Sequence, residues 1–132
     1  MQSMLSMSDA KIEPQLVKGF HGIEAGAWRW TEKQFTVVLR PPFGAGQKGA
    51  KLSVNLTAPQ AVSLSATAAG SALPPETYTT PGKYSYVRQI PASLLTGDSL
   101  RVDFHLDKAI VPNGGDVREL GIIVASVGLE SK

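Results

Sequence analysis

Apolar and polar residues alternate along much of the chain, and the alternation is cleanest over residues 51–57. There Leu52, Val54 and Leu56 are separated by single polar residues. A period of two places successive side chains on opposite faces of a β-strand, so this run predicts a strand with one buried face. The same pattern recurs over residues 35–40, 62–68, 83–90 and 100–106.

The last apolar run, residues 120–129, changes phase within itself. Its apolar positions alternate as far as Val124 and are out of phase with that series from Val127 onward. A β-bulge inserts one extra residue into a strand and shifts every later side chain to the other face. We therefore expect a bulge near Ala125 and Ser126.

Turn-forming residues separate these runs, since the chain holds nine prolines and thirteen glycines. No segment shows sustained apolar positions at helical spacing, and residues 92–96 have room for a single helical turn. Short strands between Pro/Gly turns predict an all-β fold, specifically an antiparallel β-sandwich of jelly-roll-like type. We expect one such domain over residues 11–132. The polar residues 1–10 are expected to be disordered, or an addition that does not belong to the natural domain.

Composition narrows the classes of function. The chain of 132 residues has a formal net charge of +2, 18% charged residues without a basic run, and no cysteine. A nucleic-acid-binding surface normally shows clustered basic residues, so no nucleic-acid partner is expected. Disulfides and cysteine-ligated zinc are excluded. No apolar run approaches the roughly 20 residues needed to span a bilayer, and no signal peptide is recognised, which leaves the compartment open with the cytoplasm favoured.

Both tryptophans of the chain, Trp28 and Trp30, flank Arg29 on a predicted strand. Rings two residues apart point to the same face of a strand. Such a pair either anchors a sandwich core or forms an aromatic platform on which a sugar ring stacks, with the core interpretation favoured. Tyr84 and Tyr86 share one side of another predicted strand and form a second candidate pair.

Other motifs carry little chemistry. Residues 44–49 match the G-x-G-x-x-G pattern, but a predicted strand rather than a helix follows, so a hairpin loop is the better interpretation. His21 and His105 lack the neighbouring ligands of a metal site, and no serine lies in a nucleophile elbow. We expect no metal, no cofactor and no catalytic residues. An enzyme would need converging carboxylates, for which Glu24 and Glu119 are the candidates.

A charged segment, residues 116–121, lies just ahead of the last apolar run. Arg118 is suited to hold a carboxylate such as Glu24 with two parallel hydrogen bonds, which would order the end of the sheet. The alternative is that Arg118 and Glu119 form a polar rim for sugar hydroxyls. The structural interpretation is favoured.

Two stretches together resemble a known kind of module. They are GFHGIEAGAWRWTEKQFTVVL near the N-terminus and LRVDFHLDKAIVPNGGDVRELGIIVASVGLE at the C-terminus. The pattern of Gly19-Phe20, Glu24 and Trp28-Arg29-Trp30-Thr31, followed by Asp116 and Arg118-Glu119-Leu120-Gly121, is similar to a bacterial β-sandwich accessory module. That module is attached to glycosyltransferases and methyltransferases of surface-polysaccharide assembly. The resemblance implies a jelly-roll-like sandwich and a glycan context, and it carries no catalytic residue.

The first hypothesis for function is therefore a non-catalytic β-sandwich that binds carbohydrate, with a glycosyltransferase or methyltransferase domain as a possible partner. Stacking would come from Trp28 and Trp30 or from Tyr84 and Tyr86, and hydrogen bonds from Arg29, Glu24, Arg118 and Glu119. The alternative is a structural or protein-interaction domain with buried tryptophans and an exposed apolar patch or open sheet edge. In both cases the two halves of the motif are expected to meet in space.

Overall fold

The computed structural model describes residues 1–111, 114–115 and 117–132, so Asp116 of the motif lies outside the described residues. Strands dominate, and each helix spans only one or two turns. The elements in chain order are β1 (Met4–Ser6), the 3₁₀ helix η1 (Ala10–Gln15), β2 (Leu16–Phe20), β3 (Arg29–Leu39), α1 (Ala45–Lys48), β4 (Ala50–Ala58), β5 (Val62–Ala68), β6 (Ser71–Tyr78), β7 (Gly82–Ile90), the 3₁₀ helix η2 (Ala92–Leu94), β8 (Leu100–Leu106) and β9 (Ile123–Ser131).

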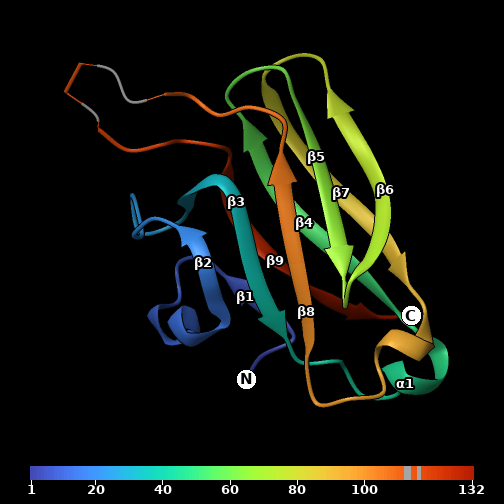
Figure 1. The fold of residues 1–132 in the computed structure, drawn as a ribbon. Coiled ribbons are helices and arrows are strands. Elements are labelled where there is room, and N and C mark those ends of the chain that lie inside the picture. Colours follow the sequence, from blue (N-terminus) through green and yellow to red (C-terminus); the bar gives the residue numbers. More distant parts are fainter. Residues whose placement is uncertain (112–113, 116) are drawn as a thin grey trace.

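The strands form one curved antiparallel sheet, in the order β6-β5-β8-β3-β9-β4-β7 (Figure 1). The short strand β1 pairs with β9, and β2 pairs with β3. The long strand β3 joins the two halves of the sheet. Its first residues, Arg29 and Trp30, pair with β9, whereas residues 34–39 pair with β8. The sheet therefore turns over on itself at β3 and encloses the core.

Side chains rather than backbone hydrogen bonds bring the two end strands, β6 and β7, together. Tyr86 donates its hydroxyl hydrogen to the carbonyl oxygen of Pro74 at 2.8 Å, and Arg88 Nε donates to the same oxygen at 2.7 Å. Arg88 Nη2 donates to the Pro75 oxygen at 3.0 Å. The sheet is thus nearly closed, and the structure confirms the predicted all-β, antiparallel class.

The core consists of the inward residues of the alternating strands. In β4, for example, Leu52, Val54 and Leu56 are buried, and the same holds for every second residue of β5 and β8. Phe35 stacks on Phe104 with ring centroids 4.9 Å apart, which links β3 to β8. The hydrophobic periodicity therefore identified the buried faces of these strands correctly.

The predicted bulge in the last strand is confirmed. Asn55 of β4 lies opposite Ser126 of β9, and the next residue, Leu56, lies opposite Val124, which leaves Ala125 as the extra residue. The residue inserted at Ala125 lets Val124 and Val127 both face the core, where both are buried.

The N-terminal residues differ from the expectation of a disordered segment. Residues 4–6 form β1 against β9, and Leu5 and Met7 are fully buried in the core. Asp9 begins η1 by accepting a hydrogen bond from the Lys11 N–H. This bond and a second one from the Gln2 side-chain amide hold the carboxyl pKa of Asp9 below its ordinary value. Only two apolar side chains anchor this segment, too few to produce a recognisable period.

A second unexpected strand is β6, which contains Pro74 and Pro75. The two prolines fall at an irregularity in the pairing, where Leu64 and Ala66 of β5 lie opposite Glu76 and Leu73. Proline is tolerated in edge strands and at bulges because no ladder hydrogen bond is lost there. Pro74 and Pro75 thus lie within an edge strand, although prolines elsewhere in the sequence separate the predicted strands.

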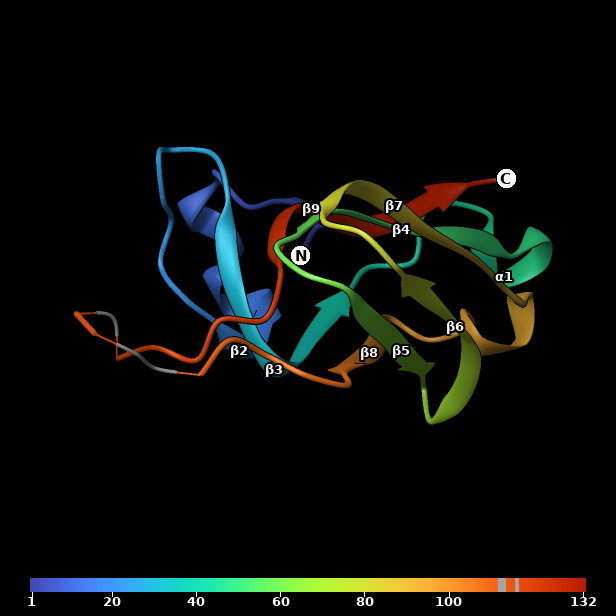
Figure 2. The same ribbon diagram turned by 90° about the horizontal axis from the view of Figure 1, so that it is seen from above.

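Figure 2 shows two long loops that extend from the same end of the molecule, on the side away from α1. One, residues 21–28, joins β2 to β3, and the other joins β8 to β9. They carry the two halves of the sequence motif. Within the described ranges no helix has the length and apolar character needed to cross a bilayer.

Candidate functional site

The two halves of the motif meet, as expected. Arg118 Nη1 pairs with Glu24 Oε1 at 2.7 Å, and the His21 imidazole Nε2 lies 2.8 Å from the carbonyl oxygen of Glu119. The Glu119 carboxylate accepts a hydrogen bond from the Lys33 N–H at 2.8 Å. Glu24 and Glu119, the carboxylates that an enzyme would need, thus both have structural partners, and together these contacts hold the two long loops.

Close packing explains another part of the motif. The Gly121 N–H donates to the Thr31 carbonyl at 2.7 Å, and the Thr31 N–H donates to the Ile122 carbonyl at 2.8 Å. A Cβ atom at Gly121 would lie 2.6 Å from the Glu32 carbonyl oxygen and 2.7 Å from Thr31 Oγ1. Only glycine fits there, so Thr31 and Gly121 serve the fold.

Arg29, predicted to contact a ligand, is instead buried in the interior, with only 1% of its surface exposed. Its Nε donates to the Met7 carbonyl at 3.2 Å, and its Nη1 pairs with Glu13 Oε1 at 2.8 Å. Arg29 therefore holds the N-terminal segment and η1 against β3. It is a structural residue that a ligand does not reach.

The tryptophans are not core residues, which corrects the favoured interpretation. Arg29 and Thr31 occupy the buried positions, and Trp28 and Trp30 alternate with them and are both partly exposed. The two indoles have different surroundings, because Trp28 alone lines a groove on the outer side of the sheet.

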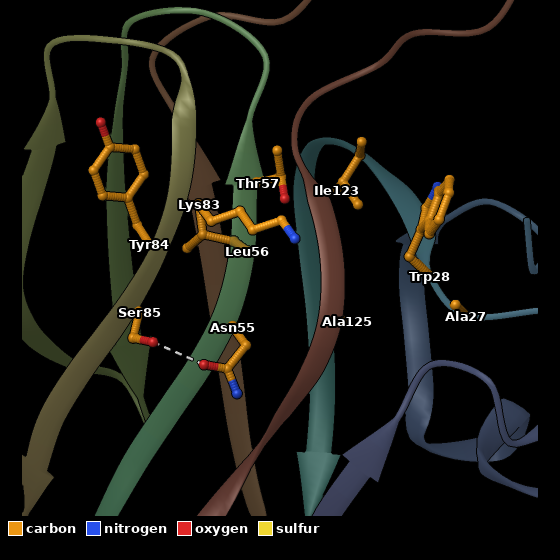
Figure 3. A pocket seen from close by; sticks show the side chains of 10 residues that line it. All are labelled: Ala27, Trp28, Asn55, Leu56, Thr57, Lys83, Tyr84, Ser85, Ile123 and Ala125. Carbon is orange, nitrogen blue, oxygen red and sulfur yellow. Dashed lines mark hydrogen bonds between the residues drawn. The ribbon is translucent and has the colours of Figure 1, made fainter. Parts of the chain in front are cut away.

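This groove has a volume of about 580 Å³ and is hereafter called the Trp28 groove (Figure 3). Residues of β4 and β9 form its floor, with Trp28 on one side and residues of β7 on the other. The lining residues are Ala27, Trp28, Asn55, Leu56, Thr57, Lys83, Tyr84, Ser85, Ile123 and Ala125.

Trp28 is positioned by the loop that the motif holds in place. Its backbone and that of Glu24 exchange two hydrogen bonds, of 2.8 and 3.2 Å, while the Glu24 carboxylate pairs with Arg118. The indole Nε1 is shielded from solvent and has no hydrogen-bond partner among the described residues. What Trp28 exposes is therefore the carbon surface of its ring.

A row of polar side chains crosses the floor of the groove. Ser85 donates to Asn55 Oδ1 at 2.8 Å, and Asn55 Nδ2 donates to Ser126 Oγ at 2.8 Å. A side-chain amide has two N–H donors and two acceptor lone pairs, so Asn55 retains one of each. The row fixes the orientation of the amide and leaves capacity for a ligand above it.

The tyrosine pair is not the exposed platform that the sequence allowed. Tyr86 is fully buried, with the Arg88 guanidinium 4.3 Å from its ring centre, and burial raises the pKa of its hydroxyl. Tyr84 stacks on Tyr78 at 4.3 Å and donates its hydroxyl to the Thr80 carbonyl at 2.7 Å. Only Tyr84 reaches the groove, at its border.

The opposite outer face of the sheet carries a smaller hollow of about 180 Å³, which we call the Asp103 face. Its lining residues come from β2, β3, β5 and β8 and include Lys18, Gln34, Thr36, Thr67, Asp103 and His105. Burial acts to raise the Asp103 pKa, but hydrogen bonds from Thr36 and Arg101 outweigh it and lower the pKa below its ordinary value. In the described part of the chain no three His, Asp or Glu side chains gather where they could hold a metal ion.

Sequence reasoning named Trp28 and Tyr84 but missed the rest of the groove. Asn55, Lys83 and Ser85 look like ordinary outward positions of amphipathic strands, and their common place depends on the pairing of β4 with β7. No protein-family model, curated protein or solved structure matches the chain. A function for this chain therefore has to be argued from the geometry of the Trp28 groove.

Proposed function

We propose that the chain is a non-catalytic, jelly-roll-like β-sandwich module that binds a glycan in the Trp28 groove. The observation that carries this proposal is a partly exposed indole ring beside a floor of amide and hydroxyl groups. The resemblance to accessory modules of polysaccharide-assembly enzymes supports a glycan as the ligand. A glycosyltransferase or methyltransferase domain would then be the functional partner.

A sugar ring has two kinds of surface, and the groove offers a partner for each. The C–H face of a pyranose is apolar and stacks on an aromatic ring, which Trp28 supplies through its exposed carbon surface. The hydroxyls need donors and acceptors, which Asn55, Thr57 and Ser85 supply from the floor. A volume of about 580 Å³ lies within the usual range for small-ligand sites.

The motif residues have a supporting role in this proposal. The Arg118–Glu24 ion pair holds the loop that ends at Trp28, and Arg29 holds the start of β3 from the inside. Neither needs to touch the glycan. The resemblance of these residues to the accessory module would then arise because they place the Trp28 indole.

The proposal is tested by binding measurements on the wild type and two tryptophan variants. A glycan array selects a ligand, and isothermal titration calorimetry then measures its affinity. We expect Trp28→Ala to weaken binding at least tenfold, because a buried aromatic contact in an interface contributes about 2 kcal/mol or more. Trp30→Phe, which alters the indole outside the groove, should keep the wild-type affinity and leave Trp28 as the only tryptophan, whose emission can be excited selectively.

Two outcomes would contradict glycan binding. One is the absence of any glycan that shifts Trp28 emission in the Trp30→Phe protein. The other is an unchanged affinity in Trp28→Ala whose thermal unfolding matches that of the wild type.

A second candidate function is a protein-interaction domain, favoured by exposed apolar residues on the β8–β9 loop. Val111 is 73% exposed and Val117 is 82% exposed. Isolated surface valines are common, but two on one protruding loop can form a contact. Cross-linking in the native host would detect a partner captured by the wild type and by Trp28→Ala but lost with Val111→Ser/Val117→Ser.

A further inference from the structure

We propose that the Trp28 groove selects an acidic glycan, and that the ammonium group of Lys83 pairs with the anionic group of the sugar. This inference rests on the proposed glycan-binding function and names the class of glycan. The anionic group is a carboxylate or a phosphate, since either gives the same charge-assisted contact with an ammonium group.

The groove carries positive charge without any negative charge. Of its ten lining residues, Lys83 is the only charged one, and none is Asp or Glu. The Lys83 side chain is exposed, and within the described residues it takes part in no ion pair or side-chain hydrogen bond. A cation beside apolar walls attracts an anion more strongly than one surrounded by water.

The Lys83 side chain extends across the floor of the Trp28 groove (Figure 3). Figure 3 shows its side chain running from β7 over β4 toward β9, whereas the Tyr84 ring points away from it. Lys83 lies opposite Thr57 in β4, and Thr57 lies opposite Ile123 in β9. The row of residues that Lys83 crosses therefore holds no carboxylate that would neutralise it.

A second lysine of the same sheet face shows the contrast. Lys51 and Thr57 lie an even number of residues apart on β4 and so share its outer face. Lys51 Nζ pairs with Glu130 Oε2 across the strands at 3.5 Å. Two lysines of one face thus differ, because Lys51 has a carboxylate opposite and Lys83 has a hydroxyl and an apolar side chain.

The geometry also fits a single sugar. Trp28 and Lys83 stand on opposite sides of a floor formed by β4 and β9 (Figure 3). A pyranose that stacks on Trp28 would extend its ring substituents toward the Lys83 side. An anionic substituent there would meet the ammonium group, while the remaining hydroxyls would meet the amide of Asn55.

The experiment compares three ligands that share one backbone: a uronate oligosaccharide, the same oligosaccharide with its carboxyl groups reduced to alcohols, and a phosphorylated form of the neutral chain. Their affinities are measured for the wild type, Lys83→Gln, Lys51→Gln and Trp28→Ala, at low and at physiological salt. We expect the wild type to bind one or both acidic forms about five- to tenfold more tightly than the neutral form. Salt should reduce this preference.

Lys83→Gln should bind all three forms with the affinity that the wild type shows for the neutral one, whereas Lys51→Gln should keep the wild-type preference. The relative affinities of the uronate and phosphate forms identify the source of the charge. Equal binding of acidic and neutral forms by the wild type would overturn the inference, as would a preference that survives in Lys83→Gln. If either of these results is found and Trp28→Ala still weakens the binding of every form, the glycan-binding function stands and only the preference for acidic glycans is wrong. If the wild type binds none of the three forms, the glycan-binding function itself is contradicted.

Discussion

The two outer faces of the sheet, the Trp28 groove and the Asp103 face, are both lined by polar residues, yet their polar groups are used differently. On the Asp103 face, the carboxylate accepts a hydrogen bond from Thr36 at 2.7 Å and pairs with Arg101 at 3.2 Å. In the groove, Lys83 has no carboxylate in its row and Asn55 keeps one donor and one acceptor. Polar composition alone does not mark a binding site, because groups that bind each other have little left for a ligand.

The aromatic residues differ in the same way. The Asp103 face has no tryptophan or tyrosine among its described lining residues, and its one phenyl ring, that of Phe104, is buried in the core. The groove has Trp28, with the carbon surface of the ring turned outward. An exposed apolar ring next to unused polar capacity is what separates a candidate site from a solvated surface.

The largest expected effect is a loss of stability that concerns both outer faces of the sheet. Arg29 lies on the core side of β3, the strand that joins the two halves of the sheet. Arg29→Met should lower the free energy of unfolding by about 1–3 kcal/mol, because the buried Met7 carbonyl loses its hydrogen-bond donor and the exposed Glu13 carboxylate loses its ion-pair partner. Urea denaturation measures this change.

Arg40→Met is the matched control, since it removes an exposed arginine just beyond the other end of β3. It should change the free energy of unfolding by no more than about 0.5 kcal/mol. Equal effects of the two substitutions would show that the buried guanidinium does not hold the N-terminal segment.

A smaller effect is expected from a substitution that alters the Asp103 face and leaves the Trp28 groove unchanged. Thr36→Val removes the hydroxyl that binds Asp103 and should lower the free energy of unfolding by about 1 kcal/mol at pH 7. Glycan affinity should not change, because Thr36 does not line the Trp28 groove. Thr67→Val is the control: it also faces Asp103 across the strands, and its hydroxyl makes no hydrogen bond within the described structure.

Acid titration sharpens the same test. The folded-state pKa of Asp103 is lowered, so its contribution to stability is present above the unfolded pKa and is lost as the pH falls through the folded pKa. The stability difference between wild type and Thr36→Val should therefore shrink as the pH falls below about 4. A difference that is constant with pH would mean that the Thr36 bond does not act on the charged carboxylate.

The smallest effect concerns the aromatic pair at the border of the groove. The Tyr78 hydroxyl is buried without a hydrogen-bond partner among the described residues, and burial raises its pKa to about 12. Tyr78→Phe keeps the stacking on Tyr84 and removes the unpartnered hydroxyl, so stability at pH 7 should stay equal or rise by a few tenths of a kcal/mol.

The alkaline limb gives this substitution a second measurement. A raised pKa means that the contribution of neutral Tyr78 is fully present below pH 10 and is lost as the pH rises through about 12. Tyr78→Phe should unfold less steeply over that range, with Tyr86 accounting for part of the remaining loss. An alkaline unfolding curve identical to that of the wild type would contradict the raised pKa of Tyr78.

Much of the fold could be predicted from local pattern. The alternation around Leu52, Val54 and Leu56 marks β4 and its buried face, and the change of phase in the last strand correctly indicates the bulge at Ala125. The ion pair of Glu24 with Arg118 was predicted from the ability of an arginine side chain to hold a carboxylate. These features depend on residues close in sequence or on complementary charges.

Strands β1 and β6 could not be predicted in this way. In β1, Leu5 is buried only because β9 lies beside it. In β6, Pro74 and Pro75 are compatible with a strand only because they lie at an edge, where the carbonyls accept hydrogen bonds from Tyr86 and Arg88. In both cases, contacts between distant residues outweigh local preference.

The sequence by itself determined the all-β class and the buried faces of the main strands, because periodicity is a local property of a chain. The complementary charges of Glu24 and Arg118 predicted that the two motif halves meet, and the fold brings these distant residues together. Only the tertiary structure decided that Arg29 lies inside while Trp28 faces outward, and that Lys83 stands across from it. The groove combines residues of β4, β7 and β9 with the loop that precedes β3, and the adjacency of these strands follows from the strand order. Strand order is set by long-range pairing and core packing, which no single segment encodes.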